Sequence, residues 1–198
     1  MKPTRMGIVI FAAVAAAGPW YTVDGYSLVS HVISLLGAQN TTGNSVMVTG
    51  FLALGLGIIL DGVRRFSWPA LPFMVFGLCM ALAGLFAHKP LSPEVDFSKL
   101  AHQIHSALAT LAGISITVGL LWQAARKTAL RPRLIALALA ALCLGLPLCM
   151  LSFLEFQGLI QRLMYLLIFA WLWACYPPAS PANKEPNATG GLAPWLNR

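Results

Sequence analysis

The feature that most constrains this chain is a series of six apolar runs, at residues 6–23, 44–63, 69–87, 101–123, 134–154 and 158–176. A bilayer core about 30 Å thick takes about 20 apolar residues per helix, and each run is close to that length. Backbone groups in lipid must be hydrogen-bonded within their own segment, and the runs lack the alternation of barrel strands. The predicted fold class is therefore all-α, a polytopic membrane bundle of about six transmembrane helices.

The composition supports this class. Hydrophobic residues make up 58% of the chain and charged residues 10%, too little polar surface to cover a water-soluble domain of 198 residues. Because the linkers are short, we expect one domain over residues 1–176. Residues 177–198, rich in Pro, Ala, Asn and Gly, are predicted to be a flexible cytoplasmic tail.

The net charge of +7 is unevenly distributed between the two sides of such a bundle. With the N-terminus inside, ten basic residues are cytoplasmic and only Lys89, Lys99 and Arg162 are outside. This asymmetry follows the positive-inside rule, so both termini are predicted to be cytoplasmic. The basic residues then orient the protein in the membrane, and no nucleic-acid partner is predicted.

Two polar segments interrupt the apolar pattern, and both fall on the predicted outer side. In the first, residues 24–37, the polar side chains recur at helical spacings of three and four, at Ser27, Ser30, His31 and Ser34. This pattern predicts a short amphipathic helix that is too short to span and lies at the membrane surface. The second segment, residues 88–106, contains His88, His102 and His105.

These histidines suggest a metal site. His102 and His105 are one helical turn apart and could ligate one divalent transition metal such as zinc, with His31 or His88 and a carboxylate completing the site. A bound water would then be acidified and could attack an ester, amide or phosphoester. In this hydrolase hypothesis the metal ligands are His31, His88, His102 and His105, and the catalytic candidates are Ser27, Ser30, Asp96 and Glu155.

Other functions fit the same residues. In the first, an outward-facing pocket lined by the histidines binds or transports a lipid or envelope metabolite, with Lys89 and Lys99 as further donors. In another, the protein is a structural or accessory membrane subunit, and the polar mouth is only a solvated cap. A bis-histidine haem would need facing histidines on two helices, whereas His102 and His105 share one. Membrane lipids are the expected partners, with a homo-oligomer or other membrane subunits as further candidates.

Two acidic residues have alternative interpretations. Asp61, near the inner end of its run, is a functional candidate as a carboxylate within the membrane. Arg64 and Arg65 follow three and four residues later, so an ordinary helical ion pair is the expected interpretation. Glu155 is either a site carboxylate or the ion-pair partner of Arg162.

Short motifs around both polar segments resemble a large, mostly bacterial family of six-span membrane proteins, catalogued as domain of unknown function number 998. They are Ile33-Ser34-Leu35-Leu36-Gly37 before Asn44, then Gly84-Leu85-Phe86, Pro93 and Asp96, with a histidine, His102 or His105, at the start of the next helix. The resemblance covers about residues 7 to 176. It implies six helices and a bacterial inner-membrane location, and it implies no reaction.

Overall fold

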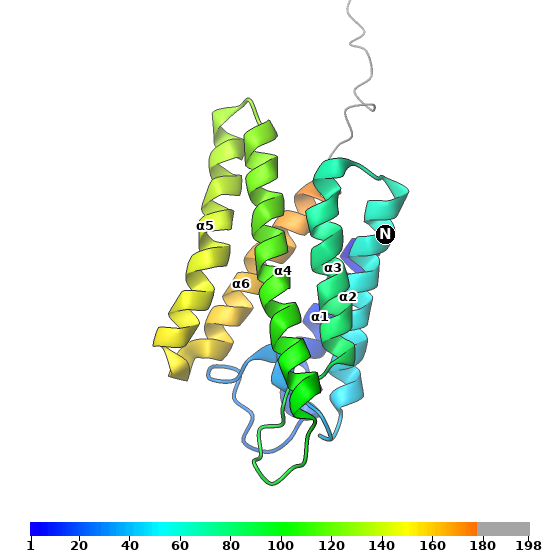
Figure 1. The fold of residues 1–198 in the computed structure, drawn as a ribbon, viewed down its shortest axis with the longest axis vertical. Coiled ribbons are helices and arrows are strands. Elements are labelled where there is room, and N and C mark those ends of the chain that lie inside the picture. Colours follow the sequence, from blue (N-terminus) through cyan, green and yellow to red (C-terminus); the bar gives the residue numbers. More distant parts are fainter. Residues whose placement is uncertain (178–198) are drawn as a thin grey trace, which may run out of the picture.

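The computed structural model describes residues 1–177 and is all-helical over that range (Figure 1). The helices are α1 (Pro3–Ala16), α2 (Asn44–Arg64), α3 (Leu71–Leu85), α4 (Lys99–Arg126), α5 (Leu130–Ser152) and α6 (Gln157–Cys175). Short 3₁₀ turns occur at Gly18–Trp20, Ile33–Gly37, Trp68–Ala70 and Leu154–Phe156. The predicted all-α class is confirmed, while the predicted tail lies outside the described residues.

Within residues 1–177, five helical segments are long and apolar enough to cross a membrane: Asn44–Arg64, Trp68–Leu85, Lys99–Arg126, Leu130–Ser152 and Leu154–Cys175. The first helix is apolar but shorter, with 14 residues. At 1.5 Å per residue it measures roughly 21 Å, less than the bilayer core. It is shorter than the predicted run because Pro19 has no backbone N–H to continue the helix.

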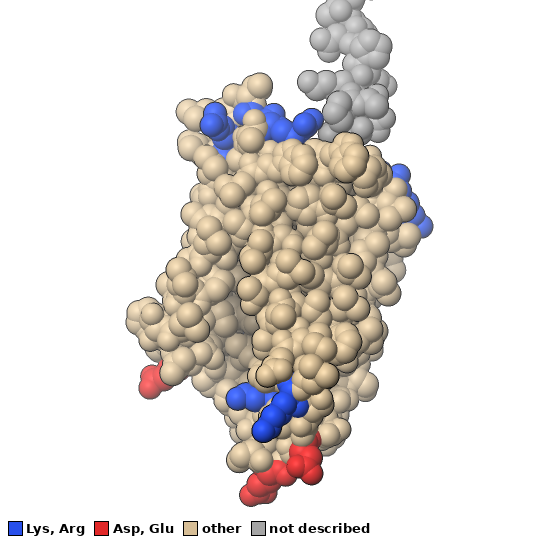
Figure 2. Space-filling model, viewed as in Figure 1, with Lys and Arg blue, Asp and Glu red and all other residues tan. Residues whose placement is uncertain are grey.

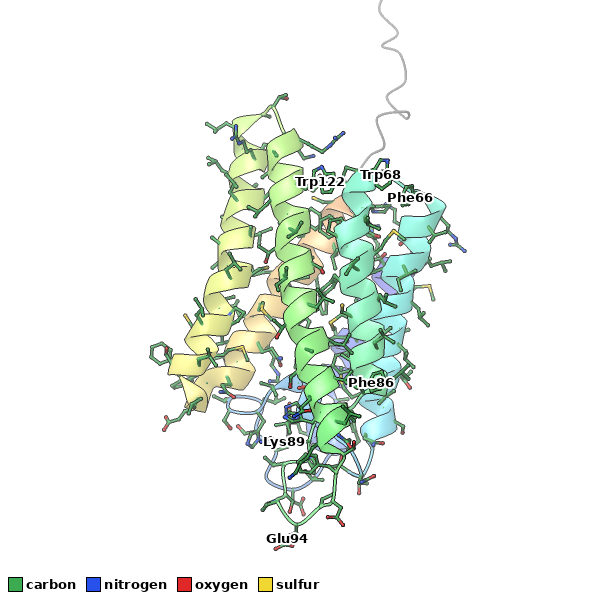
Figure 3. All side chains as sticks on the ribbon, in the orientation of Figure 1. Phe66, Trp68, Phe86, Lys89, Glu94 and Trp122 are labelled. Atoms are coloured by element: carbon green, nitrogen blue, oxygen red, sulfur yellow. The ribbon has the colours of Figure 1, made fainter. Side chains whose placement is uncertain are left out.

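The bundle has two chemically different ends. We call the end formed by residues 17–43, 86–98 and 153–156 the histidine end, and the end formed by residues 65–70 and 127–129 the basic end. Figure 2 shows Lys and Arg gathered at the top, the basic end, and acidic residues together with further basic side chains near the bottom, with an uncharged band between them on this face. Phe66, Trp68 and Trp122 lie at the basic end, where aromatic side chains suit a membrane interface (Figure 3).

Close backbone contacts hold α1, α2 and α3 together. Gly55 on α2 faces Gly77 on α3, and a Cβ atom added to Gly77 would lie 2.9 Å from the Gly55 carbonyl oxygen. A Cβ on Gly7 would likewise overlap the backbone of α2. Small residues allow this close approach in lipid, where van der Waals packing replaces the hydrophobic effect between helices.

Asp61 does not form the predicted ion pair with Arg64 or Arg65. Its buried carboxylate accepts a hydrogen bond from the backbone N–H of Thr4, with the nitrogen and oxygen 2.8 Å apart. Thr4 is in the first turn of α1, where backbone N–H groups have no partner within the helix and the helix dipole favours a negative charge. The side chain therefore joins two helices and caps one of them, whereas both arginines are exposed.

The predicted amphipathic helix over residues 24–37 is wrong. Only Ile33–Gly37 is helical, as a 3₁₀ turn, and the preceding residues form an irregular loop. The Ser27 hydroxyl accepts hydrogen bonds from the N–H groups of Val29 and Ser30, both at 3.3 Å. Such local bonds give the backbone an alternative to the helix, and here they prevail.

Candidate functional site

Three histidines meet at the histidine end. The ring centroid of His88 lies 4.6 Å from that of His102 and 5.4 Å from that of His105, both edge to face. His88 comes from the loop after α3, and the other two come from the first two turns of α4. The structure therefore brings three of the four predicted ligands near one another, and we call these three side chains the histidine cluster.

Backbone hydrogen bonds fix the rings of this cluster. Nδ1 of His105 lies 2.9 Å from the carbonyl oxygens of both Ala83 and Phe86, so it carries a hydrogen and donates to carbonyls at the C-terminal end of α3. Nδ1 of His88 donates to the Lys89 carbonyl oxygen at 2.8 Å. Nδ1 of His102 instead accepts from the Lys89 N–H, at 3.4 Å. In the neutral rings, His88 and His105 then present Nε2 lone pairs, and His102 presents an N–H.

The pKa of His88 is lowered to about 4. Burial is the main cause, because it penalises the charged imidazolium, and nearby positive charge on His105, His102 and Lys89 acts in the same direction. The hydrogen bond to the Lys89 carbonyl opposes the shift only in part. His88 is therefore a neutral acceptor at physiological pH.

The fourth histidine, His31, does not join the cluster. Its Nδ1 accepts the backbone N–H of Ser27 at 2.9 Å, and its ring packs against Tyr26, with the centroids 5.7 Å apart. This bond holds the His31 ring in its own turn, beside Tyr26 and away from the other three histidines. Within residues 1–177, no group of three or more His, Cys, Asp or Glu side chains is placed to hold a metal ion. The structure does not bring the four predicted ligands together.

The predicted catalytic residues are also dispersed. Ser27 and Ser30 belong to the turn closed by His31, and the Ser27 hydroxyl is occupied by backbone N–H groups. Asp96 and Glu155 are exposed, on different loops. The predicted pairing of Glu155 with Arg162 is not formed, because the Arg162 guanidinium binds carbonyl oxygens and the Tyr26 hydroxyl instead.

A cavity of about 380 Å³ lies beside the histidine cluster, between α3, α4, α5 and α6. His105 is the one cluster member that lines it. Most other lining groups are apolar or sulfur-containing, among them Phe76, Cys79, Met80, Ile116, Cys143, Met150, Met164 and Ile168. A mostly apolar lining with a few polar groups, in a volume of roughly 300–1,000 Å³, is typical of small-molecule sites.

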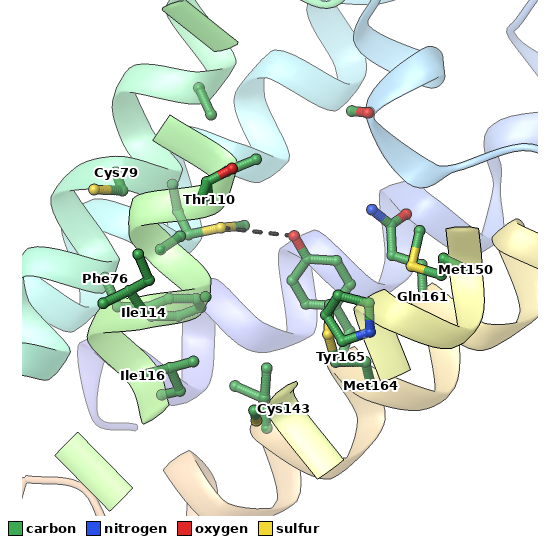
Figure 4. Close-up of a pocket in the computed structure, with 18 of the residues that line it drawn as sticks. Phe76, Cys79, Thr110, Ile114, Ile116, Cys143, Met150, Gln161, Met164 and Tyr165 are labelled. Carbon is green, nitrogen blue, oxygen red and sulfur yellow. Dashed lines mark hydrogen bonds between the residues drawn. The ribbon is translucent and has the colours of Figure 1, made fainter. Parts of the chain in front are cut away.

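The polar lining groups of the cavity include His105, Ser34 and Gln161, which all come from segments at the histidine end. Gln161 accepts the N–H of Ile33 through Oε1 at 2.6 Å, which fixes its amide beside the cavity. The Tyr165 hydroxyl has only a weak acceptor, the Met80 sulfur at 3.7 Å (dashed in Figure 4). The cavity is therefore apolar in its depth and polar toward one end.

The family model described as "Protein of unknown function (DUF998)" matches residues 6–175. The chain belongs to this family. No curated protein and no solved structure matches the chain. The predicted resemblance is confirmed, and the functional argument for this DUF998 protein rests on its own geometry.

Sequence reasoning missed the cavity of this DUF998 protein. Pro147 lies inside α5 and lines it, and because proline has no N–H, the carbonyl of Cys143 loses its helical donor there. The available signals were this proline in an apolar run and the adjacent polar residues Gln161 and Arg162 in the next run. Neither signal indicates by itself which helices enclose a space.

Proposed function

We propose that the protein binds a membrane amphiphile with one apolar chain in the cavity between α3 and α6. The chain of the ligand lies against the apolar walls, and its polar group lies at the end formed by His105, Gln161 and Ser34. The observation that carries this proposal is the cavity of about 380 Å³. Its walls are mostly apolar, and it lies between helices that are long enough to cross a membrane. The ligand class is a lipid or a lipid-like envelope metabolite.

Access from the surrounding lipid supports this proposal. The fifth helix, α5, buries only Ala136, Ala140 and Cys143 against the bundle, a single stripe at helical spacing. It forms one wall of the cavity through Cys143 and Pro147. A wall helix with so small a buried face separates from its neighbours at low cost, which gives an amphiphile a route from the bilayer.

The polar end of the cavity can form hydrogen bonds with an uncharged or zwitterionic headgroup. His105 uses Nδ1 for the backbone, which leaves Nε2 as an acceptor, and the Gln161 amide nitrogen remains a donor. The Tyr165 hydroxyl adds a donor whose present partner is weak. These groups suit hydroxyl, ester or amide functions of a ligand. We therefore propose that the protein binds this ligand and does not catalyse a reaction on it.

The cavity offers a matched pair of variants. Gly113 on α4 lines the cavity, and a Cβ atom there would meet nothing within 4 Å. Gly145 on α5 has equally open surroundings but does not line it. Gly113→Leu therefore fills the cavity, while Gly145→Leu makes the same chemical change outside it.

The test is native mass spectrometry of the full chain in detergent, titrated with a palmitoyl lysophospholipid. We expect one bound molecule per wild-type chain and an affinity about tenfold lower in Gly113→Leu, since about two methylene contacts are lost. Gly145→Leu should bind like the wild type. Equal binding by a folded Gly113→Leu protein would contradict the proposal.

A further inference from the structure

A second apolar space lies on the other side of Tyr165, between α1 and α6. It is a groove of about 300 Å³ whose α6 wall consists of Tyr165, Leu166, Phe169 and Arg162. The α1 wall consists of Phe11 and three alanines. Among the residues that the structure describes, Arg162 is the one charged residue that lines this groove, at its histidine end.

Arg162 is held by neutral groups. Its Nη1 donates to the carbonyl oxygens of Leu28, His31 and Gly158, at 2.7, 3.0 and 3.0 Å. Its Nη2 donates to the Tyr26 hydroxyl at 2.6 Å. These four bonds fix the plane and direction of the guanidinium, but none of the acceptors carries a formal charge.

The positive charge of Arg162 therefore has no counter-charge within the part of the chain that the structure describes. Among residues 1–177 it forms no ion pair, and Glu155, the acidic residue closest in sequence, is exposed on the preceding turn. The Nε hydrogen and the second Nη2 hydrogen of Arg162 have no acceptor among these residues either. That free edge is the fork that binds two oxygens of a phosphate or carboxylate.

We infer that this groove binds one anionic phospholipid, with its phosphate on the free edge of Arg162 and one acyl chain between α1 and α6. Charge complementarity selects the headgroup, because an uncompensated arginine at the polar end of an apolar groove favours an anion. The apolar walls, which include Phe11 and Phe169, suit an acyl chain. This site is separate from the cavity between α3 and α6, and the inference does not depend on that cavity.

The experiment compares dioleoyl phosphatidylglycerol with dioleoyl phosphatidylcholine, which have the same chains and differ in net charge. The full protein in detergent receives equal amounts of both lipids, and native mass spectrometry gives the ratio retained. We expect the wild type to prefer phosphatidylglycerol, and Arg162→Gln to reduce that preference about fivefold. Lys99→Gln, which removes another exposed cation at the same end, should leave the ratio unchanged.

Arg162→Gln also removes hydrogen bonds to the 26–31 loop and could change lipid binding through that loop. A second pair of variants therefore keeps Arg162 in place. Ala12 lines the groove and Ala13, its exposed neighbour on α1, does not. Ala12→Leu should lower phosphatidylglycerol binding severalfold, and Ala13→Leu should not. Repeating both in a Gly113→Leu background weakens lipid binding in the other cavity, so a change that persists there belongs to the groove.

Three results would overturn the inference. One is an unchanged lipid ratio in a folded Arg162→Gln protein, and another is equal binding by Ala12→Leu and Ala13→Leu. The third is displacement of the lipid by glycerol 3-phosphate at the same concentration, since this compound has the phosphate but no acyl chain. That result would mean that the groove contributes nothing to binding.

Discussion

At the scale of single residues, the histidines have different structural roles that depend on their hydrogen-bond partners. His105 closes the end of α3 by donating to two carbonyls, whereas His31 accepts an N–H to close a turn in a loop. His88 is neutral because burial lowers its pKa to about 4. Its protonation therefore links stability to pH.

Stability should fall as the pH is lowered from about 6.5 to about 4. In this window the unfolded chain binds a proton at His88 and the folded chain does not, so acid favours unfolding, by up to about 3 kcal/mol at 1.36 kcal/mol per pKa unit. Above about 6.5 both states are neutral and the effect vanishes. Unfolding followed by tryptophan fluorescence should show a shallower acid slope in His88→Gln, and an unaltered slope would refute this assignment.

At the scale of helices, α1 depends on its neighbours because it is short. Its first turn is capped by Asp61 of α2 rather than by its own residues, and Arg5 donates to the Trp173 carbonyl near the end of α6. The Arg5 guanidinium also lies 5.0 Å from the centroid of the Trp173 ring. Both contacts hold the start of α1 at the basic end.

Asp61→Ala should lower the free energy of unfolding by about 2 kcal/mol, because it removes a charged acceptor and leaves the buried Thr4 N–H unpaired. Reversible unfolding in mixed detergent and SDS micelles measures this difference. Asp24→Ala, at an exposed loop position, is the matched control and should change stability little. Equal losses in the two variants would show that the interhelical cap contributes nothing specific.

At the scale of the whole molecule, charged side chains gather at the two ends of the bundle, and the histidine end has acidic residues beside its few basic ones (Figure 2). The positive-inside rule then predicts that the basic end faces the cytoplasm and the histidine end faces outward. Both proposed lipid sites have their polar groups at the histidine end, so they would take their ligands from the outer leaflet. The inner-membrane location and any self-association remain predictions.

Orientation can be tested with cysteines introduced at Ser92, in the 86–98 loop, and at Thr128, between α4 and α5. A membrane-impermeant maleimide applied to intact bacterial cells should label Ser92→Cys strongly. Thr128→Cys should be labelled only after the membrane is permeabilised. The unsubstituted protein gives the background from its native cysteines, and the reverse labelling pattern would invert the topology.

The sequence by itself determined the features that depend on short stretches of chain. Apolar runs located five helices of membrane-crossing length and the shorter α1, and a three-residue spacing placed His102 and His105 one turn apart on one helix. Helix periodicity and hydropathy act over about 20 residues or fewer, so these features are local.

Only the tertiary structure decided which distant groups become partners. Asp61 bonds to a residue 57 positions away instead of to Arg64, and Arg162 bonds to Tyr26, 136 positions away, instead of to Glu155. The cavity and the groove are likewise spaces between helices, and Tyr165 lines both. Their existence depends on how helices distant in sequence meet, and local sequence pattern does not encode that geometry.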